Sequence, residues 1–297
     1  MKILCYDVGG SSTKYAILDE NAQFYDRGSV PSETASMEDF LASVKEIYDR
    51  YDNEICGVSF SMPGVIDPVT GYFHTGGAYD RFIHDINMKD VFHTIIDKPV
   101  LITNDAKCAA YGELGYGCLK DVNDAVVIVL GTGIGGCLIK DREVIYGKHL
   151  LSGEFSYINT AGTTDFNDSF AFRCGTQGLI KRTREVFETE ENFTGRQIFD
   201  LVNKGEEKAK EALHMFCMDL AIQIYNLQVI FDPEVFAIGG GISAQPVLFE
   251  VLDDCFREIE RSHGDFFLGK PDVRVCKYGN DANLIGALYR FVKENKE

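Results

Sequence analysis

Two glycine-rich turns hold the residues of this chain whose types and spacing are best suited to chemistry. The first turn lies in residues 7–14 (DVGGSSTK), and the second spans residues 131–136 (GTGIGG). Because glycine has no side chain, its backbone N–H group can approach an anion closely, and two such turns can hold the phosphates of a nucleotide. The pair of turns therefore predicts a phosphoryl-transfer enzyme.

The second turn also has to be compared with two better-known phosphate-binding patterns. Its glycines fit G-x-G-x-x-G, but that pattern indicates a dinucleotide site only where a helix follows the turn. Residues 137–146 instead predict a strand, a tight turn and another strand. A P-loop is excluded because the G-x-x-x-x-G spacing does not precede Lys14. A plain hairpin remains the alternative for either turn taken alone, and the occurrence of two such turns makes it less favoured.

Strands and helices alternate along the chain, which is typical of an α/β fold. The expected strands are 2–8, 12–18, 23–29, 55–61, 99–103, 125–130 and 235–238. The expected helices are 37–51, 106–116, 206–231 and 282–293. A length of 297 residues exceeds the usual size of a single core, so two domains are expected. We place a smaller domain at 1–118 and a larger one at 119–297, with the last helix packed on the smaller domain.

The formal net charge of −17 restricts the partners of this protein. Nucleic acids and anionic membrane surfaces are bound through basic faces, so we expect neither as a partner and predict small-molecule ligands. The alternative is that the acidity only keeps the protein soluble. The nine cysteines are scattered without a C-x-x-C pair, which suits buried free thiols in a reducing compartment. Without a signal peptide or a long apolar run, the protein is expected to be cytoplasmic.

Asp105 is the best candidate for a general base. It follows the strand predicted at 99–103, and α/β folds place their ligands at the carboxyl ends of strands. A carboxylate there could accept the proton of a hydroxyl group that attacks a phosphate. The alternative is that Asp105 only caps the following helix, and the residues alone leave both possibilities open.

Six short segments carry a resemblance to a known family. They are 7–10 (DVGG), 61–64 (SMPG), 104–106 (NDA), 131–136 (GTGIGG), 153–155 (GEF) and 238–242 (IGGGI). Together, in this order and spacing, they resemble the repressor/ORF/kinase (ROK) family of sugar kinases, and the resemblance covers essentially the whole chain. It implies two ribonuclease-H-like domains of the actin-like ATPase superfamily, with ATP and a sugar bound in a cleft between them. It also favours a homodimer, as does the long helix predicted at 206–231.

The resemblance assigns roles to individual residues. Asp105 would be the catalytic base, and Asp7 would bind Mg²⁺ through water, against the alternative of a turn-forming aspartate. The phosphates would contact Gly9, Gly10, Ser12, Thr132 and Gly133, and the adenosine would contact Gly240 and Gly241. The sugar would contact Gly64, Gly77, Asn104, Asp105, Glu154 and Tyr157. Lys14 is a second candidate for the phosphates, although a solvated side chain is the favoured interpretation.

The chain departs from the family pattern in one segment. Most members carry a histidine shortly after the Gly-Glu pair and then a cysteine-rich zinc loop, whereas this chain has Tyr157 and the single Cys174. One thiol cannot form a tetrahedral zinc site, so we expect no structural zinc and assign residues 174–178 to the start of a helix. A zinc-free branch of the family, which includes β-glucoside kinase-like proteins, has tyrosine at the histidine position.

Two function classes follow from the resemblance. The first is an ATP-dependent kinase that phosphorylates a hydroxyl group, expected to be the 6-hydroxyl, of glucose or a β-glucoside, with N-acetylmannosamine or another hexose as the alternative substrate. The second is a sugar-responsive regulator. The repressors of the family have a DNA-binding module before the first glycine turn, and the six residues before Asp7 leave no room for one. A sugar-binding protein without turnover is a third possibility, which the presence of Asp7, Asn104, Asp105 and Glu154 together disfavours.

Overall fold

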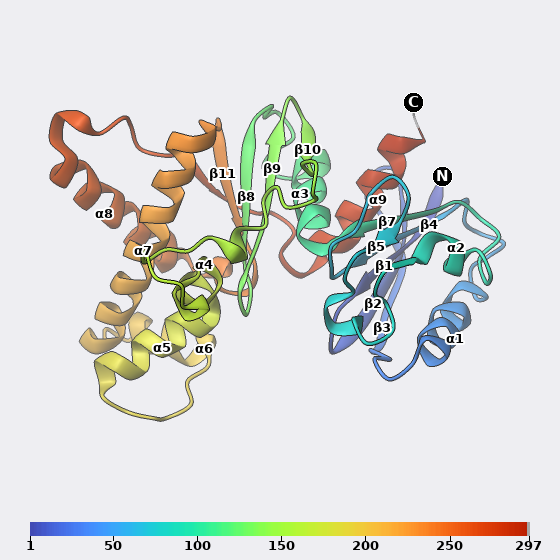
Figure 1. Ribbon diagram of the computed structural model, residues 1–297, viewed down its shortest axis with the longest axis horizontal. Coiled ribbons are helices and arrows are strands. Elements are labelled where there is room, and N and C mark those ends of the chain that lie inside the picture. Colours follow the sequence, from blue (N-terminus) through green and yellow to red (C-terminus); the bar gives the residue numbers. More distant parts are fainter. Residues whose placement is uncertain (296–297) are drawn as a thin grey trace. The chain divides into compact units, whose positions relative to one another are not determined.

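The computed structural model describes residues 1–295 of the chain (Figure 1). Within them, the chain forms two compact units, each built on a five-stranded sheet. Within the described residues, the first unit comprises 1–120, 146–150 and 280–295. The second unit comprises residues 121–145 and 151–279.

The sheet of the first unit combines an antiparallel meander with two parallel strands. The strand order is β3-β2-β1-β4-β7, in which β1, β2 and β3 form the meander and β4 and β7 run parallel to β1. Asp7 pairs with Ser61, and Ser61 pairs with Thr103, so the carboxyl ends of the three parallel strands meet at one edge. The strands are β1 (Lys2–Val8), β2 (Ser12–Asp19), β3 (Phe24–Pro31), β4 (Val58–Met62) and β7 (Val100–Asn104).

The sheet of the second unit repeats this arrangement. Its order is β10-β9-β8-β11-β12, again with a three-stranded meander followed by two strands parallel to its first strand. The strands are β8 (Ala125–Leu130), β9 (Ile134–Lys140), β10 (Glu143–Ile145), β11 (Val235–Gly239) and β12 (Val273–Val275). This duplicated ribonuclease-H-like topology confirms the predicted α/β fold class.

Helices pack on the sheets and bury two separate apolar cores. In the first unit, α9 contacts β1, β4 and β7 as well as α3, and Phe60, Ile102 and Tyr6 belong to a core that is buried from solvent. In the second unit, α7 packs with α5 and α8, and its apolar residues lie in one core with those of β8 and β11. The longer helices are α1 (Met37–Tyr48), α3 (Asp105–Tyr116), α5 (Thr176–Phe187), α6 (Gly195–Asn203), α7 (Glu207–Phe231), α8 (Pro246–His263) and α9 (Ala282–Glu294).

Several shorter elements complete the described structure. The hairpin of β5 (Tyr72–Phe73) and β6 (Ile86–Asn87) and the helix α2 (Met88–Phe92) follow β4, and α4 (Phe170–Cys174) precedes α5. The break between Cys174 and Thr176 confirms that a helix starts in this segment. Ordinary capping residues set several boundaries: Ser36 accepts the N–H of Asp39 at the start of α1, and Thr194 forms a capping box at α6.

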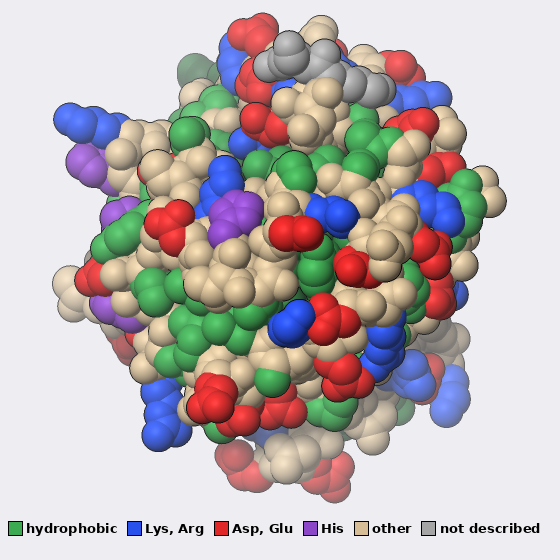
Figure 2. All heavy atoms as spheres, turned by 90° about the vertical axis from the view of Figure 1, so that its right-hand side faces the viewer, with side chains coloured by type: hydrophobic (Ala, Val, Ile, Leu, Met, Phe, Trp, Pro, Cys, Tyr) green, Lys and Arg blue, Asp and Glu red, His purple; other side chains and the backbone are tan. Residues whose placement is uncertain are grey.

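The surface of the described residues carries charges of both signs. On the face drawn in Figure 2, acidic and basic side chains are interspersed with apolar ones. No helix within residues 1–295 is long and apolar enough to cross a membrane.

Candidate active site

Asp7 lies at the carboxyl end of β1 and is held by two side chains of the first unit. Its side chain is largely buried, and its Oδ2 atom lies 3.3 Å from the Nζ atom of Lys14. Asn283, in the first turn of α9, donates a hydrogen bond of 2.9 Å to the other carboxylate oxygen. Lys14 also donates to the carbonyl of Asn280 at 3.2 Å. The Lys14 side chain is 37% exposed, as a solvated lysine would be, and its ammonium group also pairs with the largely buried carboxylate of the neighbouring strand.

The first glycine turn is held in place by hydrogen bonds from neighbouring residues of the first unit. The N–H of Gly9 donates to the carbonyl of Ser12 at 3.1 Å, which closes the turn between β1 and β2. The carbonyl of Gly9 accepts hydrogen bonds from the hydroxyl groups of Ser32 and Tyr79. Gly10 at the tip is exposed, and its N–H group has no hydrogen-bond partner among the residues the structure describes. The turn thus presents a free donor on a fixed backbone, as a phosphate site requires.

Asn104 and Asp105 lie at the start of α3, where the sequence left open which residue caps the helix. Asn104 is the N-cap of α3, where its Oδ1 atom accepts the N–H of Lys107 at 3.2 Å. Its Nδ2 atom donates to the carbonyl of Gly64 at 2.9 Å. Asp105 is the first residue of the helix, and its Oδ1 atom accepts the N–H of Ala106 at 2.8 Å. Asn104 therefore occupies the N-cap position, and Asp105 adds a hydrogen bond to one N–H group of the first turn.

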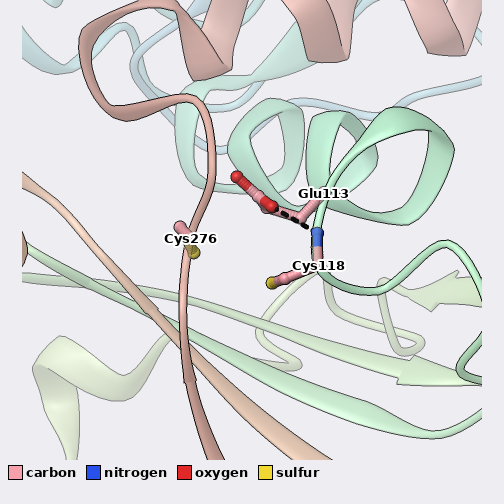
Figure 3. Close-up of side chains that lie close together, drawn as sticks. All are labelled: Glu113, Cys118 and Cys276. Carbon is pink, nitrogen blue, oxygen red and sulfur yellow. Dashed lines mark hydrogen bonds between the residues drawn. The ribbon is translucent and has the colours of Figure 1, made fainter.

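The opposite end of α3 is also closed by a side chain. Glu113 is fully buried, and its Oε2 atom accepts the N–H of Cys118 at 2.9 Å (Figure 3). The carbonyl of Glu113 accepts the N–H groups of Gly117 and Leu119 at 3.1 Å each. With Asn104 at its start and Glu113 at its end, α3 holds Asp105 at a fixed place on the sheet edge.

Gly64 and Gly77 lie in the loops that follow β4. Gly64 has a φ of 116° and accepts the hydrogen bond of Asn104, so the backbone of this loop is attached to the start of α3. Gly77 has a φ of 58°, and its Cα faces the ring of Pro63. Both predicted sugar-contacting glycines therefore lie in the same unit as Asp105, close to the carboxyl end of β4.

The oxygen atoms at this edge of the first sheet fit a divalent cation. Burial raises the pKa of the Cys108 thiol, and the nearby carboxylates of Asp7 and Asp105 raise it further. Ser61 and Thr103, which pair with each other beside Asp7, have buried hydroxyl groups that interact with the Cys108 thiol and lower its pKa. Mg²⁺ prefers such oxygen ligands and retains several waters, so the donor set suits a hydrated Mg²⁺ ion.

The second glycine turn lies in the other unit, between β8 and β9. The N-terminal turn of α5 fixes it, because Thr176 and Gln177 donate their N–H groups to the carbonyls of Gly131 and Thr132. The N–H groups of Thr132 and Gly133 have no partner among the described residues, and Thr132 is exposed. The carbonyls of the turn are thus bound from within, and its N–H groups remain available to an anion.

Gly240 and Gly241 lie beside this turn. Gly239 ends β11 and pairs with Val129 of β8, so the two segments leave neighbouring parallel strands at the same edge. Gly240 has a φ of 95°, and an added Cβ atom would lie 2.2 Å from the carbonyl oxygen of Leu130. Only glycine fits this position, because both the conformation and the close approach exclude a side chain. Nothing would lie within 4 Å of a Cβ atom at Gly241.

The segment with Glu154 and Tyr157 is attached to the same glycine turn. A Cβ atom on Gly136 would lie 2.2 Å from the ring of Phe155, so β9 accepts this ring only because residue 136 is glycine. Ser156 donates its hydroxyl to the carbonyl of Ile134. Glu154 is partly buried, whereas Tyr157 is 68% exposed. Core packing is therefore excluded as the role of Tyr157, and its ring is accessible to a ligand.

Sequence reasoning missed Asn283 and the contact between Lys14 and Asp7. Lys14 lies opposite Asp7 in the register of β1 and β2, so the predicted hairpin already placed the two side chains together. Asn283 lies 276 residues from Asp7, and no local pattern connects them. The structure collects Asp7, Gly9, Gly10, Ser12, Gly64, Gly77, Asn104 and Asp105 in the first unit, and Thr132, Gly133, Glu154, Tyr157, Gly240 and Gly241 in the second.

The position of Gly133 gives a direct test of the second turn. Its φ lies outside the left-handed region, and an added Cβ atom would meet only the Cβ of Ala171 at 3.4 Å. Gly133→Ala should change the free energy of unfolding by less than about 1 kcal/mol. If the turn holds phosphates, the methyl group should obstruct the charge-assisted hydrogen bond between the N–H of residue 133 and a phosphate oxygen. MgATP affinity should then fall about tenfold. Calorimetric titration with MgATP and, separately, with the sugar measures this, and unchanged MgATP affinity would contradict the role.

Comparison with known proteins identifies the family. The family model described as the ROK family matches residues 3–294. The chain belongs to the ROK family. This confirms the resemblance found in the sequence motifs, and it covers both units of the structure.

Individual ROK family relatives match over nearly their full length. A β-glucoside kinase from Listeria monocytogenes is 28% identical over 298 residues, which cover 99% of this chain and 98% of the relative. The solved structure of a ROK family protein from Streptococcus pneumoniae TIGR4, in complex with sucrose, is 28% identical and has a TM-score of 0.89, with 100% of this chain and 99% of that chain covered. A ROK family glucokinase from Streptomyces griseus, in complex with glucose and AMPPNP, is 19% identical and has a TM-score of 0.79, with 97% of this chain and 98% of that chain covered; it shows the shared fold.

Proposed function

We propose that this protein is an ATP-dependent sugar kinase that transfers the γ-phosphoryl group of ATP to the 6-hydroxyl of glucose or of a β-glucoside. The observation that carries the proposal is Asp105 at the start of α3, on the same sheet edge as Asp7. Family membership and the β-glucoside kinase among the relatives support the reaction and the substrate class. The glucokinase bound to glucose and an ATP analogue supports ATP as the donor.

Asp105 is the general base of the proposed reaction. Its carboxylate would accept the proton of the sugar hydroxyl as that oxygen attacks the γ-phosphorus. The amide oxygen of Asn104 accepts the N–H of Lys107, and one amide hydrogen is donated to the carbonyl of Gly64. The second amide hydrogen remains for a sugar oxygen. Glu154 and Tyr157 supply an acceptor and a ring for the sugar from the second unit.

The glycine turns would hold the nucleotide. N–H groups of Gly10, Thr132 and Gly133 are the donors that the structure leaves for phosphate oxygens, with Ser12 beside Gly10, and Gly240 and Gly241 would line the adenosine. Asp7, kept in place by Lys14 and Asn283, would hold Mg²⁺ through water. Bound Mg²⁺ neutralises phosphate charge. Lys14 contacts the carboxylate of Asp7. Its ammonium group would therefore lie close to phosphates bound at the Mg²⁺ that Asp7 holds.

A coupled assay of ADP release tests the proposed function. The purified protein is incubated with MgATP and a panel that contains glucose, N-acetylglucosamine, N-acetylmannosamine and β-linked glucose disaccharides. We expect sugar-dependent ADP release with glucose or a β-glucoside, and a 6-phosphate as the product. No sugar-dependent ADP release across the panel would overturn the kinase assignment, and release with an N-acetylhexosamine alone would overturn the substrate.

We further propose that the protein works without structural zinc. The nine cysteines are dispersed, and Cys174 is the only one in the segment that corresponds to the zinc loop of other members. We expect no stoichiometric zinc by elemental analysis, and an unchanged melting temperature after chelation. Structural zinc commonly contributes about 10 kcal/mol or more to folding, so its removal would be obvious. One zinc per chain would contradict the proposal.

The proposed setting is a cytoplasmic homodimer whose ligands are ATP and a sugar. The nine free thiols and the use of ATP suit the cytoplasm. On α7, Met215, Ile222 and Val229 are exposed at seven-residue spacing, which is the pattern of a helix that packs against another helix. This apolar face supports the dimer.

A further inference from the structure

Three exposed aromatic side chains lie together in the second unit, and no role has been given to two of them. Tyr157 is 68% exposed, Phe166 is 51% exposed and Phe172 is 43% exposed. The ring centroids of Tyr157 and Phe166 are 5.9 Å apart, and those of Phe166 and Phe172 are 5.6 Å apart. We call these three side chains the aromatic ledge. Contiguous exposed apolar surface of this kind marks ligand-binding sites in soluble proteins.

The ledge starts next to Glu154, a proposed sugar-binding residue. Glu154 is the N-cap of the short 3-10 helix that ends at Tyr157, and the N–H of Tyr157 donates to its carbonyl. Ser156, between them, is bonded to Ile134 of the glycine turn. Tyr157 is therefore attached to the same backbone as the proposed acceptor for a sugar hydroxyl, and Phe166 and Phe172 continue the ledge from Tyr157.

The loop that carries Phe166 is held in one conformation by a polar network. Asp168 accepts hydrogen bonds from Thr163 at 2.6 Å and from Arg173 at 3.4 Å. Arg173 also donates to Asp219 of α7 at 3.3 Å. The carbonyl of Asp168 accepts the N–H of Thr160, which closes the loop at its base. An ordered aromatic surface loses little conformational entropy when a ligand binds.

A polar cavity of about 220 Å³ adjoins the ledge. Phe172 belongs to both, because its ring lies against Phe166 and it also lines the cavity. The charges around the cavity pair with one another, with Arg173 between Asp168 and Asp219, and Arg182 on Asp219. The lining cations Arg173, Lys181 and Arg182 each form an ion pair with one of the lining carboxylates Asp168 and Glu185, and these hydrogen-bonding groups suit a polyhydroxylated ligand. Asn167 also lines the cavity.

We propose that the aromatic ledge and the adjoining cavity bind the second sugar ring of a β-linked glucose disaccharide. This is the ring attached to C1 of the glucose whose 6-hydroxyl is phosphorylated, so the inference rests on the proposed function. A pyranose has an apolar C–H face, which packs on an aromatic ring, and a rim of hydroxyl groups, which bind polar side chains. The structure thus assigns specificity for the size of the acceptor to Phe166 and Phe172.

The first experiment compares two acceptors. For the double variant Phe166→Ala/Phe172→Ala, kcat/KM is measured with cellobiose and with glucose. Loss of the stacking surface should lower the ratio of the two values, cellobiose over glucose, by about tenfold, mainly through a higher KM for cellobiose. Phe266→Ala is the matched control, because this phenylalanine is 86% exposed and lies in the same unit outside the ledge. The control should leave the ratio unchanged.

The second experiment observes binding without catalysis. The chain contains no tryptophan, so Phe166→Trp introduces a single fluorescent reporter into the ledge. Titration with cellobiose should give a saturable change in the emission of Trp, because the second ring covers the indole. Titration with glucose, which has no second ring, should give no change.

The outcomes separate this proposal from the proposed function. If glucose is phosphorylated but cellobiose is not, or if the double variant leaves the ratio unchanged, the ledge proposal is overturned and the kinase assignment stands. Equal emission changes with glucose and cellobiose would overturn the ledge proposal as well. If no sugar is phosphorylated and neither sugar changes the emission, both proposals fail together.

Discussion

Replacing Asp105 with asparagine is expected to abolish most turnover and to leave the fold and sugar binding intact. The asparagine side chain keeps an oxygen for the N–H of Ala106, and the cap of α3 is supplied by Asn104, so the helix start is preserved. What is lost is the ability to accept a proton. General-base catalysis contributes about 10²- to 10⁴-fold, and kcat should fall within that range. Measurement of kcat beside the dissociation constant of the sugar checks the expectation.

A second aspartate offers a matched control for this variant. Asp90 is an exposed aspartate in the first turn of α2, so Asp90→Asn removes a carboxylate from the same kind of helix position in the same unit. Any effect of charge at a helix start on stability should appear in both variants. Only Asp105→Asn should lower kcat. A near-normal kcat for Asp105→Asn would remove the base from the mechanism.

Gly240→Ala is expected to have the largest effect on the stability of the second unit. The alanine would have to adopt a φ near 95°, and its Cβ atom would lie 2.2 Å from the carbonyl oxygen of Leu130. Strain of this kind costs about 1–3 kcal/mol before the steric conflict is added, so the free energy of unfolding should fall by about 3 kcal/mol or more. Denaturant unfolding measures the loss, and MgATP affinity should weaken in the folded fraction because the segments at the ends of β8 and β11 are forced apart.

The neighbouring glycine separates the structural effect from the binding effect. Nothing lies within 4 Å of a Cβ atom at Gly241, and its φ is not positive, so Gly241→Ala should leave stability within about 0.5 kcal/mol. If the segment lines the adenosine, Gly241→Ala should still weaken MgATP binding. Wild-type stability for Gly240→Ala would show that the turn is not constrained as described.

The strands that begin each unit could be predicted because their apolar residues form short, well-bounded runs. β1 occupies 2–8 and β8 occupies 125–130, as expected from the sequence. The strand expected at 55–61 starts instead at Val58, because turns at the end of α1 continue through residue 54 and Cys56 bonds to Lys2 ahead of the strand. The helix α8 was missed, although Leu248, Leu252 and Ile259 recur along it at helical spacing.

The candidate site was predictable to the extent that it depends on local sequence. An aspartate after a strand suggested Asp105 as a candidate base, whereas the identity of the N-cap, Asn104, is seen only from its contact with Lys107. The attachment of Phe155 to Gly136, and of α5 to the second glycine turn, arises from packing between segments distant in sequence. The contact of Asn283 with Asp7 is of the same kind. Such contacts form only when segments far apart in the sequence pack together. No local sequence pattern predicts them.

The contribution of α9 to the first unit has a consequence for how the protein is made. Besides Asn283 on Asp7, Ala287 accepts the hydroxyl of Ser59 at 2.7 Å, and the ring of Phe291 packs on Gly57. The sheet that needs these groups is complete once residue 104 has been synthesised, whereas α9 is the last helix of the described chain. At a synthesis rate of about 5–20 residues per second, that sheet exists without α9 for roughly ten seconds or more. The first unit is therefore finished only after the second unit has been synthesised, and until then a nascent chain exposes one face of its sheet.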